Sequence, residues 1–145
     1  DPFVPAEAME KEGVIVAKDL KDLYSHSNLV SLHIPATEQT KNSIGYDLLS
    51  LMPKGGCLVN TARKEVINEE GLVKALEERE DLKYITDVAT ANHAAIAEKF
   101  GKRVFGTPKK MGAETAEANM NAGLAAASQI VDFFKTGNKK FQVNR

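Results

Sequence analysis

The sequence predicts an open, doubly wound α/β fold, and two observations carry this prediction. Short, continuous apolar runs alternate along the chain with longer segments that are apolar on one side only. A continuous apolar run is typical of a strand in a parallel sheet, where both faces are covered. One-sided segments between such runs are typical of the crossover helices that join parallel strands.

Four runs are the expected strands. Two are strongly apolar, Leu29–Ile34 and Cys57–Thr61, and two are weaker, Leu82–Val88 and Arg103–Gly106. Cys57 is the one cysteine of the chain, so a disulfide within it is excluded and a reducing compartment fits. Because Cys57 lies inside an apolar run, we expect a buried core residue.

Helices are expected between the strands. Asp19–His26 has its apolar residues, Leu20, Leu23 and Tyr24, on one side. Tyr46–Met52 stops at the breaker P-K-G-G.

A third and a fourth helix follow later in the chain. Asn68 suits the N-cap of the third, because the carboxylates of Glu69 and Glu70 follow in its first turn, and its inward residues are Leu72, Val73 and Leu76. The long fourth helix spans about Ala113–Lys135, and Gly137 suits the residue after its end. Its apolar stripe consists of Met120, Leu124, Ala127, Val131 and Phe134.

The composition excludes several classes of function. The 145 residues suffice for one domain, are 43% hydrophobic and carry a formal net charge of −1. This charge balance offers no basic surface for nucleic acid, and no apolar run approaches the roughly 18 residues that a membrane span requires. Three scattered histidines lack metal-ligand spacing. We expect no nucleic acid, membrane or metal as a partner.

Polar residues follow each expected strand. They are Pro35–Thr37, Ala62–Lys64, Asp87 and Thr107–Lys110. In open α/β sheets, ligands bind outside the carboxyl ends of the strands. A single loop charge is more often only solvated, but lysines, an arginine and an aspartate gathered at one edge indicate a site for an anionic ligand.

Two long stretches resemble a known family. S-L-H-I-P-A-T-E-Q-T-K-N-S-I-G and L-M-P-K-G-G-C-L-V-N-T-A-R-K-E-V-I-N-E-E-G-L-V-K-A-L closely resemble the NAD-dependent D-isomer-specific 2-hydroxyacid dehydrogenases, in particular their D-3-phosphoglycerate dehydrogenase branch. The resemblance extends from Asp1 to about Phe134. It implies the second half of a Rossmann-type doubly wound parallel sheet, followed by a long C-terminal helix.

The resemblance also implies a domain organisation. Asp1 and Pro2 match the end of the family's second strand, where the carboxylate binds the adenosine ribose of NAD, and the glycine-rich phosphate loop lies upstream of this pair. Residues 1–111 would be the C-terminal half of the NAD-binding domain. Residues 112–145 would be an interdomain helix and a segment returning to the substrate domain. The expectation is therefore the C-terminal half of a longer enzyme, inactive by itself.

Site roles follow from the resemblance residue by residue. Arg63 would lie beside the nicotinamide and bind the substrate carboxylate with its planar fork. Asp87 would bind the nicotinamide carboxamide. The other cofactor-binding positions are Thr61 and Ala62 through their backbone, and His33, Pro35 and Thr40 before them, although His33 by itself is more often a packed strand histidine.

The sequence departs from the family at the acid–base pair. Asn92 occupies the position of the family's glutamate, and T-P-K-K-M-G-A-E-T-A-E-A replaces a stretch that contains the histidine. Alignment through the following helix places Lys110 at the histidine, which we prefer, whereas alignment through Thr-Pro places Lys109 there. A lysine is a plausible general base where burial and nearby cations favour its neutral amine.

Other residues offer alternatives. Lys64 replaces the family's usual glycine, and either binds a substrate phosphate or is solvated. His93 is a candidate for a displaced acid–base group. Glu98 or Glu114 could supply the missing carboxylate.

Three functions remain open from the sequence. The first is oxidation of 3-phosphoglycerate to 3-phosphohydroxypyruvate in serine biosynthesis, by a cytoplasmic homodimer. The second keeps the NAD chemistry on glyoxylate, hydroxypyruvate or another small anionic 2-oxo acid. The third is a non-catalytic, NAD-sensing binding protein like the corepressor relatives of the family.

Overall fold

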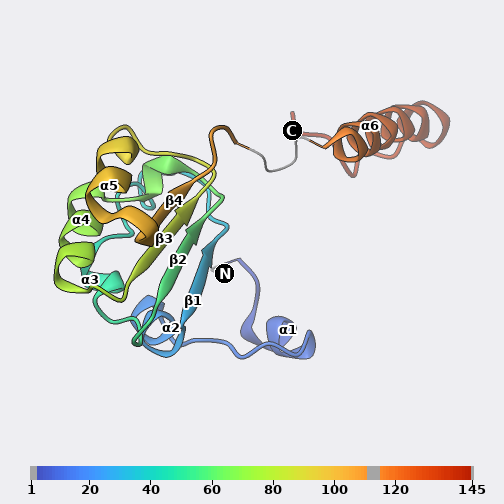
Figure 1. Cartoon of the computed structure of the whole chain (residues 1–145). Helices are drawn as coiled ribbons and strands as arrows, with labels where there is room; N and C mark the ends of the chain where they lie inside the picture. Colours follow the sequence, from blue (N-terminus) through green and yellow to red (C-terminus); the bar gives the residue numbers. More distant parts are fainter. Residues whose placement is uncertain (1–2, 111–114, 145) are drawn as a thin grey trace. The chain divides into compact units, whose positions relative to one another are not determined.

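The computed structural model describes residues 3–110 and 115–144, and the chain divides into two compact units, Asp1–Pro108 and Lys109–Arg145. The first unit contains α1 (Ala6–Lys11), α2 (Leu20–His26), β1 (Leu29–Leu32), α3 (Tyr46–Leu49), β2 (Cys57–Asn60), η1 (Lys64–Val66), α4 (Glu69–Glu78), β3 (Lys83–Thr86), α5 (His93–Phe100), η2 (Gly101–Arg103) and β4 (Val104–Gly106) (Figure 1). The second unit contains α6 (Ala116–Thr136).

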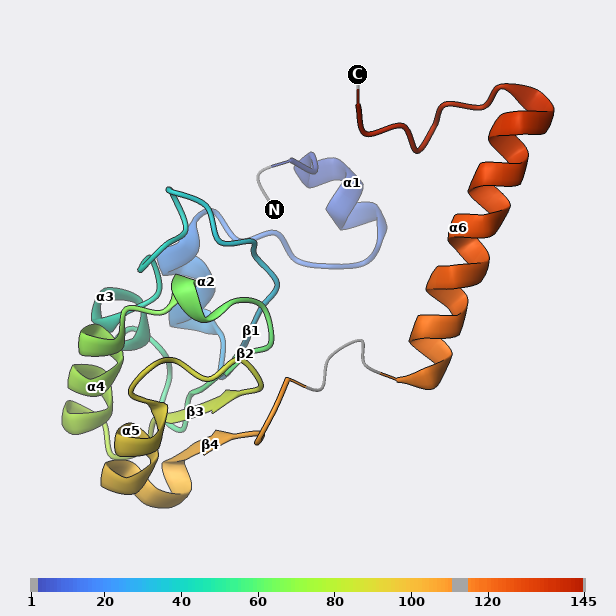
Figure 2. The same cartoon turned by 90° about the horizontal axis from the view of Figure 1, so that it is seen from above.

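The four strands form one parallel sheet in the order β1-β2-β3-β4. Each strand pairs with the next along the chain, for example Leu29 with Cys57 and Cys57 with Lys83. Right-handed crossovers that all step in one direction place their helices on the same face of a sheet. Accordingly, α3, α4 and α5 lie on one face (Figures 1 and 2). The α/β fold class predicted from the sequence is confirmed.

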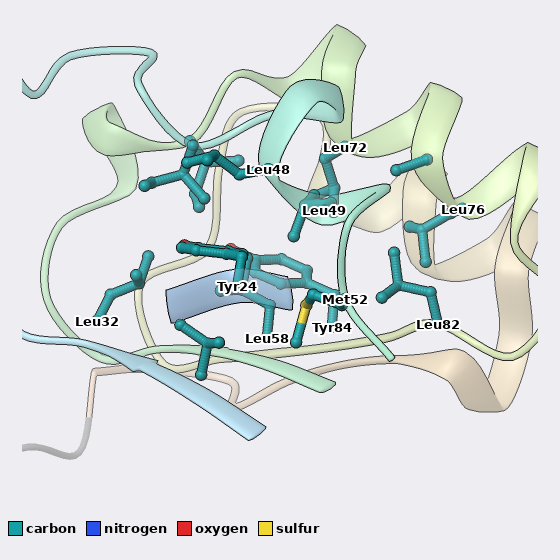
Figure 3. Packing of buried hydrophobic residues seen from close by; sticks show 14 of the residues in the cluster. Tyr24, Leu32, Leu48, Leu49, Met52, Leu58, Leu72, Leu76, Leu82 and Tyr84 are labelled. Carbon is teal, nitrogen blue, oxygen red and sulfur yellow. The ribbon is translucent and has the colours of Figure 1, made fainter. Parts of the chain in front are cut away.

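The core lies between this face and the helices. Its buried side chains come from α2, α3 and α4 above the sheet and from the strands below (Figure 3). Among them are Tyr24, Leu48, Leu49, Leu58, Leu72, Leu76, Leu82 and Tyr84. Burial raises the pKa of the Tyr24 hydroxyl, so this ring stays neutral inside the core.

The opposite face of the sheet is exposed, so the expectation of strands buried on both faces is wrong for this chain. Along β1 and β3, exposed and buried residues alternate. Leu29 is 65% exposed and Phe105 is 59% exposed. Cys57 points to this face and is only half-buried, although burial still raises the pKa of its thiol.

Most helices and strands are shorter in the structure than the sequence predicted. Of the apolar residues expected on the inner side of α2, only Tyr24 is buried, and Leu20 and Leu23 are exposed. Each strand ends at the last residue that pairs with a neighbouring strand, and the residues that follow form the loops at the carboxyl edge of the sheet. The sequence patterns did not identify α1 or α5, which are short and have few or no buried residues.

The start of α4 matches its prediction and explains a glycine. The Asn68 side chain accepts a hydrogen bond from the N–H of Gly71 at 2.7 Å, and Glu69 and Glu70 lie in the first turn. Gly71 lies against the start of α3, so that a Cβ atom on it would come within 2.6 Å of the Tyr46 nitrogen. Only glycine permits this approach of the two helices.

The second unit consists of α6 and its following segment. Thr115 caps the helix by accepting a hydrogen bond from the Ala118 N–H at 3.0 Å, and Gly137 ends it with a φ of 72°, as expected. The apolar stripe of α6 is exposed within this unit. Among residues 3–110 and 115–144, no helix is both long and apolar enough to cross a membrane.

Arg79 forms a cluster of hydrogen bonds at the edge of the sheet where the strands begin. The guanidinium donates to the carbonyls of Met52 and Pro53 and to both oxygens of Asp81, at 2.7 to 3.1 Å. Asp81 also accepts the N–H of Gly55 at 2.6 Å. These bonds fix the turn that precedes β2 to the turn that precedes β3.

Replacing Gly71 by alanine should destabilise the protein by about 1 to 3 kcal/mol, because the added methyl group overpacks the α3–α4 contact. Urea unfolding measures this loss. Gly123 in α6 is the control, since a Cβ there meets nothing within 4 Å. Alanine at that position should leave stability unchanged or raise it by up to about 1 kcal/mol. Equal effects at the two positions would refute the close approach.

Acid should weaken the Arg79 cluster. The Arg79 guanidinium, together with the Gly55 N–H, holds the pKa of the Asp81 carboxyl far below its ordinary value. The charged form is therefore favoured by folding, and its contribution is complete above the unfolded pKa and is lost as the pH falls through the folded one. Asp81→Asn should lower the urea midpoint at pH 7, and the difference from wild type should shrink below about pH 4. A difference independent of pH would contradict this.

Candidate active site

The candidate site lies at the carboxyl edge of the sheet. Because all four strands run in the same direction, the residues after β1, β2, β3 and β4 emerge along that one edge. The structure therefore brings the loops that follow β2 and β3, with Arg63 and Asp87, to neighbouring positions.

Asn60 organises the loop after β2. It is the last residue of the strand and its side chain is fully buried. Its Oδ1 accepts the N–H of Ala62 at 3.0 Å, and its Nδ2 donates to the carbonyl of Arg63 at 2.9 Å. One amide group thus folds Thr61, Ala62 and Arg63 back over the end of the strand.

Thr86 performs the same task at the end of β3. Its buried hydroxyl donates to the Asn60 carbonyl at 2.8 Å and accepts the Val88 N–H at 3.0 Å. The N–H of Asp87 also donates to the Asn60 carbonyl, at 3.3 Å. Asp87 is only 9% exposed, so the structure fixes it firmly beside the loop that carries Arg63.

Arg63 is an exposed residue in extended backbone conformation immediately before η1. Its Nη1 donates to the Ala62 carbonyl at 2.7 Å. A guanidinium has five N–H donors, and this bond uses one of them. The group can therefore bind a carboxylate while its own loop restrains it.

The loop after β1 is held by Thr40. The Thr40 hydroxyl donates to the Pro35 carbonyl at 2.6 Å and accepts the N–H of Thr37 at 2.7 Å. His33 is exposed, and its Nε2 lies 2.9 Å from the Ser31 hydroxyl. The role of Thr40 that the structure displays is to shape the loop, and cofactor contacts of His33, Pro35 and Thr40 stay a prediction.

The loop after β3 ends at Asn92 and His93. Asn92 donates its backbone N–H and its Nδ2 to the Glu69 carboxylate, at 3.1 and 2.8 Å. His93 begins α5, is half-buried, and meets the Tyr84 ring edge-to-face with centroids 6.4 Å apart.

Residues 1–111 match the family described as "D-isomer specific 2-hydroxyacid dehydrogenase, NAD binding domain". The chain belongs to this family. The resemblance inferred from the sequence is thereby confirmed, and so is NAD as the cofactor of this type of domain.

Relatives and solved structures agree with this assignment. D-3-phosphoglycerate dehydrogenase of Methanocaldococcus jannaschii is 34% identical over 131 residues, which cover 90% of this chain and 25% of the relative. The enzyme of the same name from Escherichia coli K12 is 32% identical, over 86% of this chain and 32% of that protein.

The crystal structure of NAD+-bound 3-phosphoglycerate dehydrogenase from Entamoeba histolytica is 50% identical with a TM-score of 0.84, covering all of this chain and 45% of that one. D-lactate dehydrogenase from Aquifex aeolicus is 24% identical with a TM-score of 0.68, over 92% of this chain and 44% of its own, and shares the fold. The chain thus spans between a quarter and a half of the length of these proteins.

The lysines stay candidates. Lys109 and Lys110 are exposed residues at the start of the second unit, and their role as the family's acid–base group stays a prediction. Lys64 is exposed in η1 and borders a hollow of about 740 Å³ that is also lined by Glu65, Glu69 and Glu70. Three carboxylates and one ammonium group line this hollow, a balance that disfavours an anionic ligand there and supports the solvated alternative for Lys64.

The other residues that the sequence suggested for the site are Glu98, Asp1, Pro2 and Glu114. Glu98 is exposed on α5. Asp1, Pro2 and Glu114 lie outside the described residues, so the ribose-binding role of the Asp-Pro pair and the carboxylate role of Glu114 stay predictions. Within residues 3–110 and 115–144, no group of three or more His, Cys, Asp or Glu side chains is arranged to hold a metal ion.

Sequence reasoning missed Asn60, Thr86 and Glu69 as organisers of the site. Asn60 and Thr86 are each the polar last residue of a strand, and a polar residue at the buried end of a strand must find hydrogen-bond partners. That signal was present in the sequence. The partner of Glu69 is 23 residues away and no local pattern indicates it.

Replacing Asn60 by alanine should destabilise the protein by about 2 kcal/mol, because the Ala62 N–H and the Arg63 carbonyl lose their buried partner. Amide hydrogen exchange at residues 61–63 should accelerate more than elsewhere. Asn28→Ala is the control, since its exposed amide makes a 3.3 Å bond to the Lys54 carbonyl. Unchanged exchange at 61–63 in Asn60→Ala would show that the loop holds its shape without this side chain.

Proposed function

We propose that this chain is the cofactor-binding part of an NAD-dependent D-3-phosphoglycerate dehydrogenase, which converts 3-phosphoglycerate to 3-phosphohydroxypyruvate for serine biosynthesis. The observation that carries the proposal is the pair of loops after β2 and β3. They follow adjacent strands and carry an exposed arginine, Arg63, and a buried aspartate, Asp87, in a domain of the NAD-binding family. Sequence identity to proteins named D-3-phosphoglycerate dehydrogenase supports this substrate over others.

The donor set at the edge fits the nicotinamide end of NAD. A carboxylate such as Asp87 accepts hydrogen bonds from a carboxamide, and the backbone of Thr61 and Ala62 lies beside it, folded by Asn60. On the substrate side, the Arg63 fork can bind a carboxylate with two parallel hydrogen bonds. Together these groups would hold the nicotinamide and the substrate in a fixed relative orientation before reaction.

The chemistry needs a hydride and a proton to leave the substrate. When bound, NAD+ would supply the acceptor for the hydride from C2 of the hydroxy acid. We assign the removal of the hydroxyl proton to the amine of Lys110, with Lys109 as the alternative. Arg63 would hold the substrate carboxylate. The Lys64 hollow is too acidic to be the phosphate site, so we place no phosphate contact there.

The finer assignments belong to the same proposal. Residues 1–111 would form the second half of the NAD-binding domain, and residues 112–145 would connect it to the substrate domain. The intact protein would work as a cytoplasmic homodimer. A reductase for glyoxylate, hydroxypyruvate or another 2-oxo acid remains the alternative for substrate choice.

One observation favours a second candidate function, a non-catalytic NAD sensor. The position of the family's acid–base glutamate is occupied by Asn92, whose amide is bonded to Glu69. The exposed Arg63 argues for the enzyme, because a sensor has no need to bind a substrate carboxylate.

Replacing Lys110 by alanine in the intact protein should lower the rate of NADH formation from 3-phosphoglycerate by about a hundredfold or more, the range expected for a general base. The base must be a neutral amine to accept the proton, so any increase of the wild-type rate with pH that depends on it should be absent from the variant. Lys109→Ala is the matched control.

The other outcomes separate the alternatives. Full activity in both lysine variants would overturn lysine catalysis and make His93 the next candidate. Loss only in Lys109→Ala would assign the base to that residue. A wild-type protein that binds NADH but oxidises none of the 2-hydroxy acids would favour the sensor.

A further inference from the structure

A charged cross-link joins α4 to the loop after β3. Glu69, the first residue of α4, accepts the backbone N–H of Asn92 at 3.1 Å with one carboxylate oxygen and the Asn92 Nδ2 at 2.8 Å with the other. Glu69 is half-buried, whereas its neighbour Glu70 is exposed. Two charge-assisted hydrogen bonds from one carboxylate to one residue restrain both its backbone and its side chain.

The cross-link fixes the far end of the loop that carries Asp87. The near end is held at the sheet, where the backbone N–H of Asp87 donates to the Asn60 carbonyl and the backbone N–H of Val88 donates to the Thr86 hydroxyl. Glu69 holds the same loop at Asn92, immediately before α5. The loop of residues 87–92 is hydrogen-bonded at both ends, and this removes most of its conformational freedom before any ligand binds.

His93 transmits the restraint to the end of β4. Its ring fills the space beside Gly106, since a Cβ atom on Gly106 would lie 2.2 Å from His93 Nε2. The ring also meets Tyr84 of β3 edge-to-face. His93 therefore packs against side chains or backbone of two strands and supports the carboxyl end of β4 at Gly106.

The Glu69 carboxylate is ionised at neutral pH. Its partial burial raises the pKa, but the hydrogen bonds that it accepts from the loop outweigh this and hold the pKa below its ordinary value. Both oxygens are engaged with Asn92, so Glu69 does not replace the family's glutamate as an acid–base partner. Its charge is used to hold the loop.

We propose that Glu69 is a positioning residue for the cofactor: acting through Asn92, it fixes the loop that presents Asp87 and the histidine that supports the end of β4. The inference rests on the proposed contact of Asp87 with the nicotinamide. In this chain, Asn92 serves as the tether of the loop, and a carboxylate at that position would face the Glu69 carboxylate and break the cross-link.

An ordinary role at the start of a helix is the competing explanation for Glu69, because acidic residues stabilise the first turn of any helix. Glu70 lies in the same turn and shares that role. Glu70→Ala is therefore the matched control: it removes the same interaction with the helix dipole and leaves the loop bonded.

The test uses the intact protein with Glu69→Ala, Glu70→Ala, Asn92→Asp and the double variant Glu69→Gln/Asn92→Asp. NADH affinity is measured by the fluorescence of NADH, and amide exchange at residues 87–93 is measured without cofactor. Glu69→Ala and Asn92→Asp should each weaken NADH binding about tenfold, the equivalent of one strong hydrogen bond. Glu70→Ala should bind like wild type.

The double variant provides the rescue. Its glutamine can accept the backbone N–H of residue 92 with Oε1 and donate from Nε2 to the new carboxylate, so both bonds of the cross-link return, the backbone bond unchanged and the side-chain bond with its polarity reversed. Binding should recover to within about threefold of wild type, a coupling that a double-mutant cycle measures. A helix-start role alone predicts no such recovery.

Two results would overturn the inference. The first is NADH affinity in Glu69→Ala and Asn92→Asp equal to that of wild type. The second is equal loss in Glu69→Ala and Glu70→Ala. A wild-type protein without dehydrogenase activity would refute the proposed reaction alone, because NADH affinity still decides the positioning role. A wild type that does not bind NADH would overturn the cofactor role of Glu69 together with the proposed function, and faster exchange at residues 87–93 in Glu69→Ala but not in Glu70→Ala would then show a purely structural cross-link.

Discussion

The geometry of the ligand edge depends on one buried hydrogen-bonded pair, Asn60 and Thr86. Both side chains are fully buried at the ends of adjacent strands, where an unsatisfied polar group is costly. Their partners are the backbone groups of the two loops that carry Arg63 and Asp87. The core can keep these polar groups only if both loops adopt their observed turns, so core packing and site geometry are fixed together.

The sheet supplies the second constraint. Four parallel strands in sequential order place every crossover helix on one face and every strand exit on one edge. The helices bury one face and leave the other, with Leu29 and Phe105, exposed in this chain. The site therefore lies at the carboxyl edge of the sheet, and hydrogen bonds of Thr40, Asn60 and Glu69 restrain the loops that form it.

The resemblance places a glutamate of the family at position 92, and Asn92 differs from it both in its side chain and in its hydrogen-bond partner. An asparagine there can donate to a carboxylate, and α4 supplies one at its first residue. The loop thus has a structural bond at the position where the resemblance places the family's acid–base glutamate. The proposed lysine base is compatible with this arrangement, because a carboxylate beside an ammonium group would hold its proton more tightly.

The sequence by itself determined the fold class, the parallel sheet and which residues follow its strands, because these depend on local periodicity, turn chemistry and strand direction, and its resemblance to known proteins indicated the family. It also identified Asn68 and Gly137 at helix ends, where the signal lies within a few residues. Only the tertiary structure decided which face of the sheet is covered, why Gly71 must be glycine, and that Glu69 bonds to Asn92. These contacts join segments about 20 or more residues apart, and their partners are selected by helix packing, which leaves no local pattern in the sequence.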